Sequence, residues 1–368
     1  MKKAIVSVIN DLVTDQRVHR NCMALKKAGY EVLLIGRELK NSLPMNERPY
    51  QTKRMKLWFE KGAFFYAEYN IRLFFFLGFN KADLYFINDL DTMPAMYLEN
   101  KLRRKSLIYD SHEYFTEMPE LVNRRTIQSI WKFIEKHSVP KIKHCITVNE
   151  SIANLFNREY NTDFKVIRNI PRTIKVESKS RKELGLDEDK KIVLLQGAGI
   201  NMDRGAEELV EAVEFLDKDI QLLIIGGGEV IDSLRVKGER FKEKIRFIPK
   251  QTPEKLAQYT RVADLGISID KDTNINYRYS LPNKLFDYLH AGLPVLCTRL
   301  DEIEKIVLKY QVGDFIEYHQ PTHIAAKINE MLSDPNRIRK WKANTQKVKE
   351  ELNWELEEQN LIDIINEV

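Results

Sequence analysis

Lys284 and Asp287 stand three residues apart where a helix is expected to begin, within the segment 279–297. On a helix this spacing places both side chains on one face. The lysine can neutralise a phosphate, and the carboxylate can accept hydrogen bonds from sugar hydroxyls. A helix that only packs against a core needs neither residue in its opening turn. The pair therefore predicts a site for a nucleotide sugar.

A glycine-containing loop at residues 196–205 offers further phosphate contacts. Gly197 and Gly199 allow the backbone to approach a ligand, and the helix expected from about residue 206 presents free N–H groups. Arg204 stands just before that helix and suits a diphosphate. The loop lacks both the Walker ending and a complete Gly-x-Gly-x-x-Gly, so it does not predict dinucleotide binding. A tight turn is the alternative explanation of its glycines.

Two more loops of the back half can contact a ligand. Gly228 ends the triplet 226–228, where close approach to a ligand and a sharp strand-to-helix turn explain the glycines equally well. Pro249 lies in the loop 248–250, whose main chain can hydrogen-bond the edge of a base. These loops are weaker indications than the lysine–aspartate pair.

The front half carries polar side chains directly after two apolar runs. Asp89 and Asp91 follow one run, and Asp110, His112 and Glu113 follow the next. Neighbouring parallel strands end at the same edge of a sheet, so we expect these side chains to meet. Such crowding suits substrate hydroxyls or acid–base chemistry better than packing. No second histidine lies at ligand spacing, so no bound metal is expected.

Asp15 and Arg17 stand at the expected start of the first helix, in the polar loop 10–20. Asp15 can cap this helix or contact a ligand, and both explanations stay open. The loop follows the first apolar run, so it belongs to the same sheet edge as the acidic loops.

Short apolar runs alternate with longer helical patterns, which is typical of parallel sheets covered by helices. The runs lie at 4–9, 31–35, 84–87, 107–109, 145–148 and 165–167, then at 192–195, 221–225, 245–248, 265–269, 294–297 and 315–316. We predict an α/β protein with two doubly wound, Rossmann-like domains that face a cleft. The linker is expected in the polar stretch 169–188, so the domains would span residues 1–170 and 171–349.

The net charge of +5 is unevenly distributed. Residues 1–170 hold 28 Lys or Arg against 19 Asp or Glu, whereas residues 171–368 hold 31 against 35. A basic front half can meet anionic lipid, an anionic acceptor or nucleic acid, or it can simply be solvated. The basic residues are dispersed and accompany no nucleic-acid motif, which argues against nucleic acid.

Cysteines and apolar stretches bear on location. Cys22, Cys145 and Cys297 lie far apart in apolar surroundings, as expected of buried thiols in a reducing cytoplasm. We expect neither a signal peptide nor a membrane span, and therefore a cytoplasmic protein. The aromatic segment 58–79 favours a core helix, and a patch resting on the inner face of the membrane is the alternative.

With these loops in place, the chain resembles family 4 glycosyltransferases of the GT-B fold, in a branch that builds bacterial surface polysaccharides. The most specific stretch is PNKLFDY at 282–288, followed by AGLPV at 291–295. NDLDT at 88–92, YDSHE at 109–113 and RG at 204–205 also match. The resemblance implies a retaining, metal-independent hexosyltransferase with a UDP- or GDP-linked donor and no other cofactor. It also implies a helix at about 350–368 that crosses back to the front domain.

The resemblance assigns roles to individual residues. Asp287 would bind the donor ribose, Arg204 and Lys284 would neutralise the leaving diphosphate, and His112 would face the transferred sugar. The other donor-side residues would be Gly197, Gly199, Gly228, Pro249, Tyr279 and Asn283, and the acceptor-side residues would be Asp15, Arg17, Asp89, Asp91 and Glu113. The acceptor would be a glycan or a lipid-linked molecule, reached through peripheral membrane contact of the basic front domain.

Two positions depart from the family pattern. Tyr279 stands where the first acid of a Glu-x7-Glu element is usual, and Ala198 stands where an arginine often follows the first glycine. These departures predict a different donor sugar. Two other functions stay open: a nucleotide-sugar epimerase of the same fold, and a non-catalytic binding subunit of a partner transferase, which Tyr279 supports.

Overall fold

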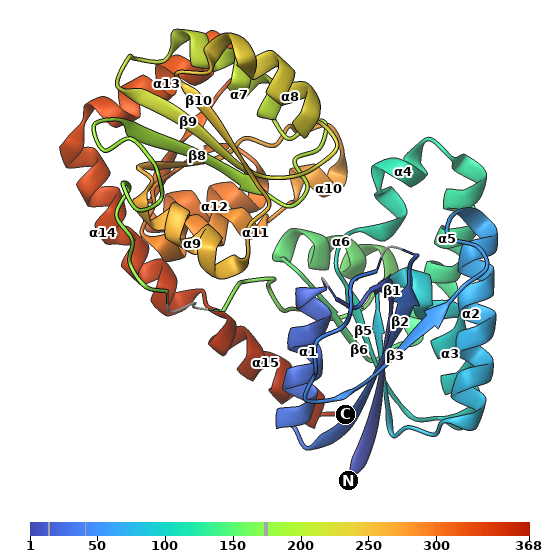
Figure 1. Ribbon diagram of the computed structural model, residues 1–368. Coiled ribbons are helices and arrows are strands. Elements are labelled where there is room, and N and C mark those ends of the chain that lie inside the picture. Colours follow the sequence, from blue (N-terminus) through green and yellow to red (C-terminus); the bar gives the residue numbers. More distant parts are fainter. Residues whose placement is uncertain (14, 41, 173–175) are drawn as a thin grey trace. The chain divides into compact units, whose positions relative to one another are not determined.

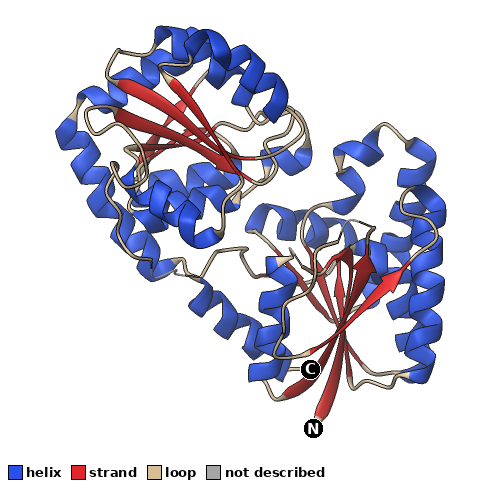
Figure 2. Ribbon diagram, viewed as in Figure 1, coloured by secondary structure: helices blue, strands red, loops and turns tan. Residues whose placement is uncertain are grey.

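The computed structural model describes residues 1–13, 15–40, 42–172 and 176–368. Residue 14 of the predicted polar loop and residues 173–175 of the predicted linker lie outside this description. The chain divides into two compact units, Met1–Asn169 with Glu355–Val368, and Ile170–Trp354 (Figure 1). Each unit is a parallel sheet flanked by helices (Figure 2), so the predicted α/β class with two doubly wound domains is confirmed.

The N-terminal unit is built on a seven-stranded parallel sheet in the order β3-β2-β1-β4-β5-β6-β7. Its strands are β1 (Lys2–Asp11), β2 (Tyr30–Glu38), β3 (Gln51–Lys56), β4 (Leu84–Asn88), β5 (Ser106–Ser111), β6 (His144–Thr147) and β7 (Phe164–Val166). The central strands are buried along most of their length, which explains their continuous apolar runs. The sequence did not predict β3, because this edge strand is mostly polar and exposed.

Helices cover the two faces of this sheet and connect its strands. They are α1 (Gln16–Lys27), α2 (Gly62–Phe79), α3 (Met93–Arg103), α4 (Pro119–Val122), α5 (Arg125–Ser138) and α6 (Glu150–Tyr160), with short 3-10 turns at Leu90–Thr92, Phe115–Glu117 and Val139–Lys141. Helix α1 ends at Lys27 and is followed by Gly29, whose φ of +88° suits a glycine.

Helix α15 (Trp354–Asn366) completes the N-terminal unit from the far end of the sequence. Leu361 and Ile365 are buried. Glu357 accepts hydrogen bonds from the backbone N–H of Arg168 at 3.0 Å and from its guanidinium at 3.2 Å, and Glu358 pairs with Lys27. The helix therefore joins this unit by both apolar packing and ion pairs.

The C-terminal unit is built on a six-stranded parallel sheet in the order β10-β9-β8-β11-β12-β13. Its strands are β8 (Lys191–Gly197), β9 (Ile220–Gly226), β10 (Ile245–Pro249), β11 (Leu265–Ser268), β12 (Val295–Thr298) and β13 (Gly313–Ile316). Its helices are α7 (Ala206–Ala212), α8 (Ile231–Gly238), α9 (Pro253–Val262), α10 (Ile275–Arg278), α11 (Asn283–Ala291), α12 (Asp301–Tyr310), α13 (Pro321–Ser333) and α14 (Pro335–Glu351), with 3-10 turns at Val213–Phe215 and Glu239–Phe241.

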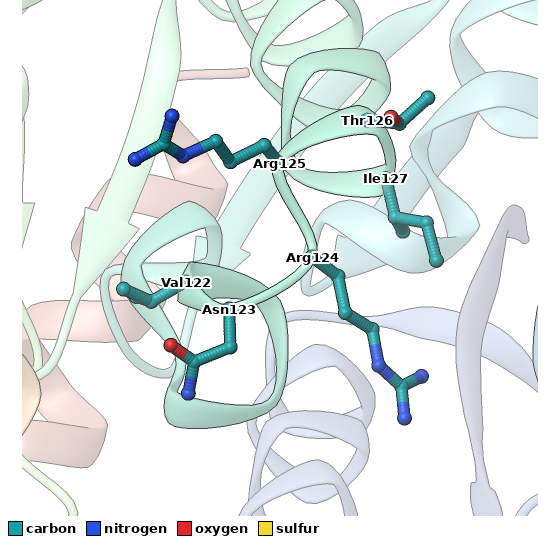
Figure 3. Close-up of a pocket in the computed structure, with 6 residues that line it drawn as sticks. All are labelled: Val122, Asn123, Arg124, Arg125, Thr126 and Ile127. Atoms are coloured by element: carbon teal, nitrogen blue, oxygen red, sulfur yellow. The ribbon is translucent and has the colours of Figure 1, made fainter.

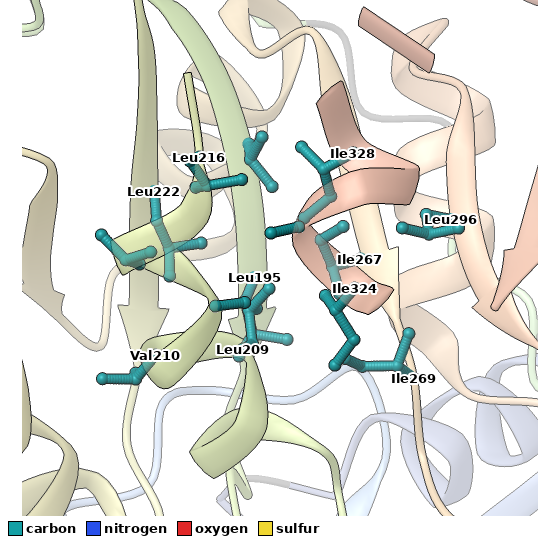
Figure 4. Packing of buried hydrophobic residues seen from close by; sticks show 14 of the residues in the cluster. Leu195, Leu209, Val210, Leu216, Leu222, Ile267, Ile269, Leu296, Ile324 and Ile328 are labelled. Atoms are coloured by element: carbon teal, nitrogen blue, oxygen red, sulfur yellow. The ribbon is translucent and has the colours of Figure 1, made fainter. Parts of the chain in front are cut away.

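Two apolar clusters form the core of this unit. In the first, Leu195 and Leu222 of the sheet pack against Leu209 of α7 and Ile324 of α13 (Figure 4). The second includes Leu184 and Leu186, which were predicted to lie in the linker. That prediction is wrong for the second half of the stretch 169–188, because these leucines are buried in the core rather than solvated.

All three cysteines are buried and none forms a disulfide, as predicted. Burial raises the pKa of each thiol. Among the described residues, no helix is long and apolar enough to cross a membrane.

Candidate functional site

The glycine loops after β8 and β9 pack against each other in the C-terminal unit. The N–H of Gly227 donates to the carbonyl of Gly197 at 3.2 Å, and the N–H of Ile200 donates to the carbonyl of Gly227 at 2.9 Å. A Cβ added to Gly226 would lie 1.8 Å from the Gly197 oxygen, and one added to Gly228 would lie 2.3 Å from the Ile200 nitrogen. Loop packing alone therefore explains Gly226 and Gly228.

Gly197 and Gly199 differ from these two glycines. A Cβ at either position would meet nothing closer than 3.5 Å. Gly199 is exposed and Gly197 is half-buried. Neither glycine is required by packing, so both leave backbone open to an approaching ligand.

Two cations, Arg204 from the loop before α7 and Lys284 from the first turn of α11, meet on one buried carboxylate. Arg204 lies 3.2 Å from Oδ2 of Asp270, and Lys284 lies 3.2 Å from Oδ1 of the same side chain. Asp270 is fully buried, whereas the Arg204 and Lys284 side chains are 29% and 12% exposed. The Arg204 guanidinium also stacks 4.4 Å from the ring centre of Tyr277.

This cluster leaves hydrogen-bonding capacity for an anion. Within the described part of the chain, Nε of Arg204 is buried without a hydrogen-bond partner. Gly205, next to it, has a φ of +72° and begins α7, and a Cβ there would lie 2.3 Å from the Ile269 oxygen. The backbone on both sides of the ion cluster is thus tightly positioned.

Asp270 is the site residue that sequence reasoning missed. It lies two residues beyond the end of β11, at the edge of the sheet where ligands of parallel sheets bind. That position is the signal that could have found it. The apolar run 265–269 predicts a strand but does not distinguish the aspartate that follows it.

Asp287 projects from α11 and is bonded to the end of β8. Nε2 of Gln196 donates to Oδ2 of Asp287 at 3.1 Å, and the hydroxyl of Thr260 donates to Oε1 of Gln196 at 2.8 Å. Helix α11 is held by buried Leu285, Phe286 and Leu289 and ends at Gly292, whose φ is +83°. The predicted helix start before Lys284 and Asp287 is confirmed.

The other predicted donor-side residues lie around these elements. Asn283 is the exposed first residue of α11, and Tyr279 is a half-buried residue just after α10. Pro249 is the exposed last residue of β10. Their contacts with a donor stay predictions.

His112 of the N-terminal unit lies between two carboxylates. Its Nδ1 is 3.0 Å from Oδ2 of Asp89, and its Nε2 is 3.3 Å from Oδ2 of Asp110, the latter without hydrogen-bond alignment. Burial works to lower the pKa of His112, but Asp89 and Asp110 raise it well above its ordinary value. The two carboxylates therefore favour the protonated imidazole.

Arg17 supports this cluster through Asp110. Its guanidinium donates to both oxygens of Asp110, at 3.0 and 2.6 Å, and to the carbonyl of Ile167 at 3.0 Å. Burial works to raise the pKa of Asp110, but the charges of Arg17 and His112 lower it. Arg17 was predicted on the acceptor side; its side chain is buried and hydrogen-bonded to Asp110, and its role toward an acceptor stays a prediction.

The remaining acceptor-side residues occupy three different environments. Asp15 accepts a hydrogen bond from the Val18 N–H at 3.0 Å and caps α1, so the capping explanation applies. Asp91 is buried, and burial together with the charge of Asp89 raises its pKa well above the usual value. Glu113 is half-buried, next to His112.

Strand pairing explains why the acidic loops meet. Strands β4 and β5 are parallel neighbours with Asn88 opposite Asp110, so the residues that follow them share one edge. Asp89 adopts a φ of +59°, and Oδ1 of its carboxylate accepts a hydrogen bond from the backbone N–H of His112 at 2.8 Å. The predicted meeting of Asp89, Asp110 and His112 is confirmed.

A surface hollow of about 620 Å³ lies in the N-terminal unit between α4 and α5. Six consecutive residues line it, from Val122 to Ile127 (Figure 3). Arg124 and Arg125 extend in different directions, so their guanidinium groups do not converge on one ligand. Among the described residues, no group of three or more His, Cys, Asp or Glu side chains is arranged to hold a metal ion.

Comparison with known proteins gives two family matches that together span residues 15–348. The family described as "Glycosyltransferase Family 4" matches residues 15–178, and the family described as "Glycosyl transferases group 1" matches residues 176–348. A D-inositol 3-phosphate glycosyltransferase of Xylanimonas cellulosilytica is 20% identical over 201 residues. The match covers 53% of this chain and 46% of that relative, less than half of its length.

Solved structures share the fold over nearly the whole chain. Sucrose-phosphate synthase from Thermosynechococcus elongatus has a TM-score of 0.80 at 16% identity, covering 100% of this chain and 99% of that one. Anabaena HepE in complex with UDP-glucose has a TM-score of 0.74 at 13% identity, covering 100% of both chains. Both likenesses concern the fold. With the matching families and the GT-B architecture, the chain belongs to the glycosyltransferases of family 4.

Proposed function

We propose that the protein is a retaining, metal-independent hexosyltransferase that moves a sugar from a nucleotide-sugar donor to a glycan or lipid-linked acceptor in bacterial polysaccharide biosynthesis. The observation that carries this proposal is the convergence of Arg204 and Lys284 on Asp270. Two cations fixed at the carboxyl edge of a parallel sheet suit the diphosphate of such a donor.

The donor would bind to the C-terminal unit. Arg204 and Lys284 would contact the diphosphate, while the open backbone at Gly197 and Gly199 lets it approach. Asp287, held by Gln196, would accept hydrogen bonds from the ribose hydroxyls. UDP is the first nucleotide to test, because HepE, which shares the fold, was solved with UDP-glucose. GDP is the second.

The proposed reaction forms a bond between the acceptor oxygen and the anomeric carbon of the sugar. The bond from that carbon to the diphosphate oxygen breaks on the same face, so the configuration is retained. The leaving phosphate takes the acceptor proton, and no carboxylate pair at hydrolase spacing is required. The protein would contribute positioning and stabilisation of the charge that grows on the diphosphate.

The N-terminal unit would bind the acceptor. His112, held between Asp89 and Asp110, would contact the transferred sugar as the family resemblance implies. Asp89 and Glu113 would offer hydrogen-bond acceptors to hydroxyl groups. Arg17 and Asp15 would act indirectly, through Asp110 and the start of α1. We propose that the protein works in the cytoplasm at the inner face of the membrane.

The test replaces the two cations. Arg204→Ala and Lys284→Ala should each lower sugar transfer by about 10²-fold or more. Each variant removes a cation that would neutralise the negative charge growing on the leaving diphosphate. Lys237→Ala is the matched control, since this lysine forms an exposed ion pair with Glu211 on the same unit. Transfer and donor hydrolysis are measured across UDP- and GDP-sugars, and calorimetry measures nucleotide binding. Transfer at the wild-type rate by both site variants would contradict the proposal.

The same assay separates two other functions. A sugar that changes while its nucleotide stays attached would identify an epimerase. Nucleotide binding without turnover across the whole donor panel would identify a non-catalytic subunit, the function that Tyr279 favours, because this residue replaces a usual acid.

A further inference from the structure

Helix α2 of the N-terminal unit is apolar on two opposite faces. One face packs into the core through Phe65, Tyr69, Leu73 and Leu77. The opposite face leaves large apolar side chains exposed, namely Phe64, Ile71, Phe75 and Phe79, the last of them 89% exposed. A helix that is apolar all round is normally covered on every side. One face of α2 therefore packs in the core, as predicted, while its other apolar face is exposed.

Neighbouring elements enlarge this exposed face. Trp58, just before the helix, is 85% exposed. Helix α3 packs beside α2 (Figure 1) and exposes Leu98 and Leu102. Arg103 of α3 donates to the carbonyl of Gly78 at 2.6 Å and so ties the ends of the two helices together. We call the seven exposed side chains the α2–α3 face: Trp58, Phe64, Ile71, Phe75, Phe79, Leu98 and Leu102.

Basic residues surround the α2–α3 face. Residues 48–81 contain seven Lys or Arg and only two Asp or Glu. One of the two acids, Glu68, is occupied by the backbone N–H groups of Trp58 and Phe59 and by Arg72. The lysines at 53, 56, 61 and 81 are all exposed. Arg54 and Lys56 pair with Glu38, and the remaining exposed lysines leave an excess of positive charge on and beside α2.

Some of these cations lie against the aromatic rings. The Arg72 guanidinium is 4.8 Å from the ring centre of Trp58, and Nζ of Lys53 is 4.9 Å from that of Phe76. Long basic side chains that run along apolar surface and end in a charge are suited to a boundary between hydrocarbon and anionic headgroups.

We propose that the α2–α3 face rests on the surface of an anionic phospholipid bilayer. Its aromatic and aliphatic side chains would enter the boundary between headgroups and acyl chains, and its lysines would meet lipid phosphates. A second copy of the chain is a poorer occupant, because a twofold contact would bring the two basic rims together. The proposal deepens the proposed function, on which it rests only for the idea that the acceptor is lipid-linked.

The experiment measures co-sedimentation of the whole protein with vesicles, in the absence of any donor. Vesicles of phosphatidylcholine mixed with phosphatidylglycerol are compared with phosphatidylcholine alone. The variant Phe75→Glu/Phe79→Glu places two carboxylates on the α2–α3 face, and we expect it to lower binding to anionic vesicles at least ~10-fold. Val236→Glu is the matched control: this side chain is 76% exposed on α8 of the other unit, and binding should not change.

A second variant tests the charge. Lys56→Gln/Lys61→Gln should weaken binding to anionic vesicles and reduce its sensitivity to salt, because both lysines are exposed on the rim. Circular dichroism and the shift of Tm by UDP are recorded for every variant. An unchanged UDP shift separates loss of membrane binding from failure of the donor site.

Three results would overturn the proposal. The first is wild-type protein that leaves anionic vesicles unbound. The second is a Phe75→Glu/Phe79→Glu variant that binds vesicles as the wild type does. The third is a dimer, seen by sedimentation velocity without lipid, that this variant dissociates, because the face would then be an interface between two copies of the chain.

Discussion

At the scale of single residues, Asp270 decides how the two candidate phosphate ligands are held. A fully buried carboxylate is unfavourable unless it is paired, and here each oxygen has its own cation. Removing its charge leaves Arg204 and Lys284 facing each other without a counter-ion. An incoming diphosphate would then supply the missing negative charge. Loss of the Asp270 charge should therefore lower the stability of the protein and strengthen its binding of a nucleotide diphosphate.

We predict that Asp270→Asn lowers the free energy of unfolding by about 2 kcal/mol, because two charge-assisted hydrogen bonds weaken. UDP or GDP should raise the Tm of this variant by more than it raises that of the wild type. Asp272→Asn is the control, since that aspartate pairs with Arg278 at the surface and should change neither quantity. A smaller ligand shift in Asp270→Asn than in the wild type would show that Asp270 does not compete with the diphosphate.

The His112 cluster makes stability depend on pH. Asp89 and Asp110 raise the pKa of His112 in the folded protein above its unfolded value of about 6.5. The stabilisation is therefore fully present below about pH 6.5 and is lost as the pH rises towards the folded pKa. The free energy of unfolding of the wild type should exceed that of His112→Gln by on the order of 1 kcal/mol, and this difference should be largest near pH 6. Urea unfolding at several pH values measures it, and a difference that grows with pH would contradict this assignment.

At the scale of elements, the two glycine loops of the C-terminal unit behave as one packed structure. Gly226 has a φ of +145° and touches Gly197, whereas a Cβ at Gly227 would meet nothing within 4 Å. The triplet 226–228 thus contains two glycines with a steric reason and one without. Sequence alone cannot separate them, because the contact comes from another loop.

We predict that Gly226→Ala lowers the free energy of unfolding by about 3 kcal/mol or more, through steric overlap and an unfavourable φ. Gly227→Ala should change it by less than about 1 kcal/mol. Chemical denaturation of the two variants gives the comparison. Equal stability of both would mean that the loops separate readily.

The sequence predicts the buried strands, because each forms a short apolar run between two helical patterns. The strands β1, β4, β8 and β9 follow their apolar runs because both faces of the sheets are buried. Strand β3 was not predictable, because an edge strand can be polar. The sequence also placed His112 beside Asp89 and Asp110, since strand order sets that edge. It did not predict that Arg17 pairs with Asp110, because this contact joins two distant parts of the sequence and appears only in the tertiary structure.

At the scale of the whole molecule, the last helix belongs to the first unit. Leu361 is buried against the N-terminal unit, whereas Leu356 on the same helix is 48% exposed. The C-terminal unit has its own two apolar clusters and does not include residues 355–368. A substitution on the packed face of α15 should therefore lower the stability of the N-terminal unit and leave that of the C-terminal unit unchanged.

We predict that Leu361→Ala lowers the stability of the N-terminal unit by about 2–4 kcal/mol, through lost burial and a cavity. Leu356→Ala is the control and should have little effect. Scanning calorimetry with and without UDP follows both units, and the transition that UDP shifts should keep its Tm in Leu361→Ala. If Leu361→Ala lowered the Tm of both transitions equally, the two units would unfold together.

The position of α15 also has a consequence for synthesis on the ribosome. The N-terminal unit is made first, yet residues 355–368, which complete it, follow the entire stretch 170–354. At translation rates of about 5–20 residues per second, the nascent unit waits about 10–40 s for this helix. During that interval the surface that Leu361 and Ile365 will cover stays open to chaperones. We therefore expect the unit that is translated second to finish folding first.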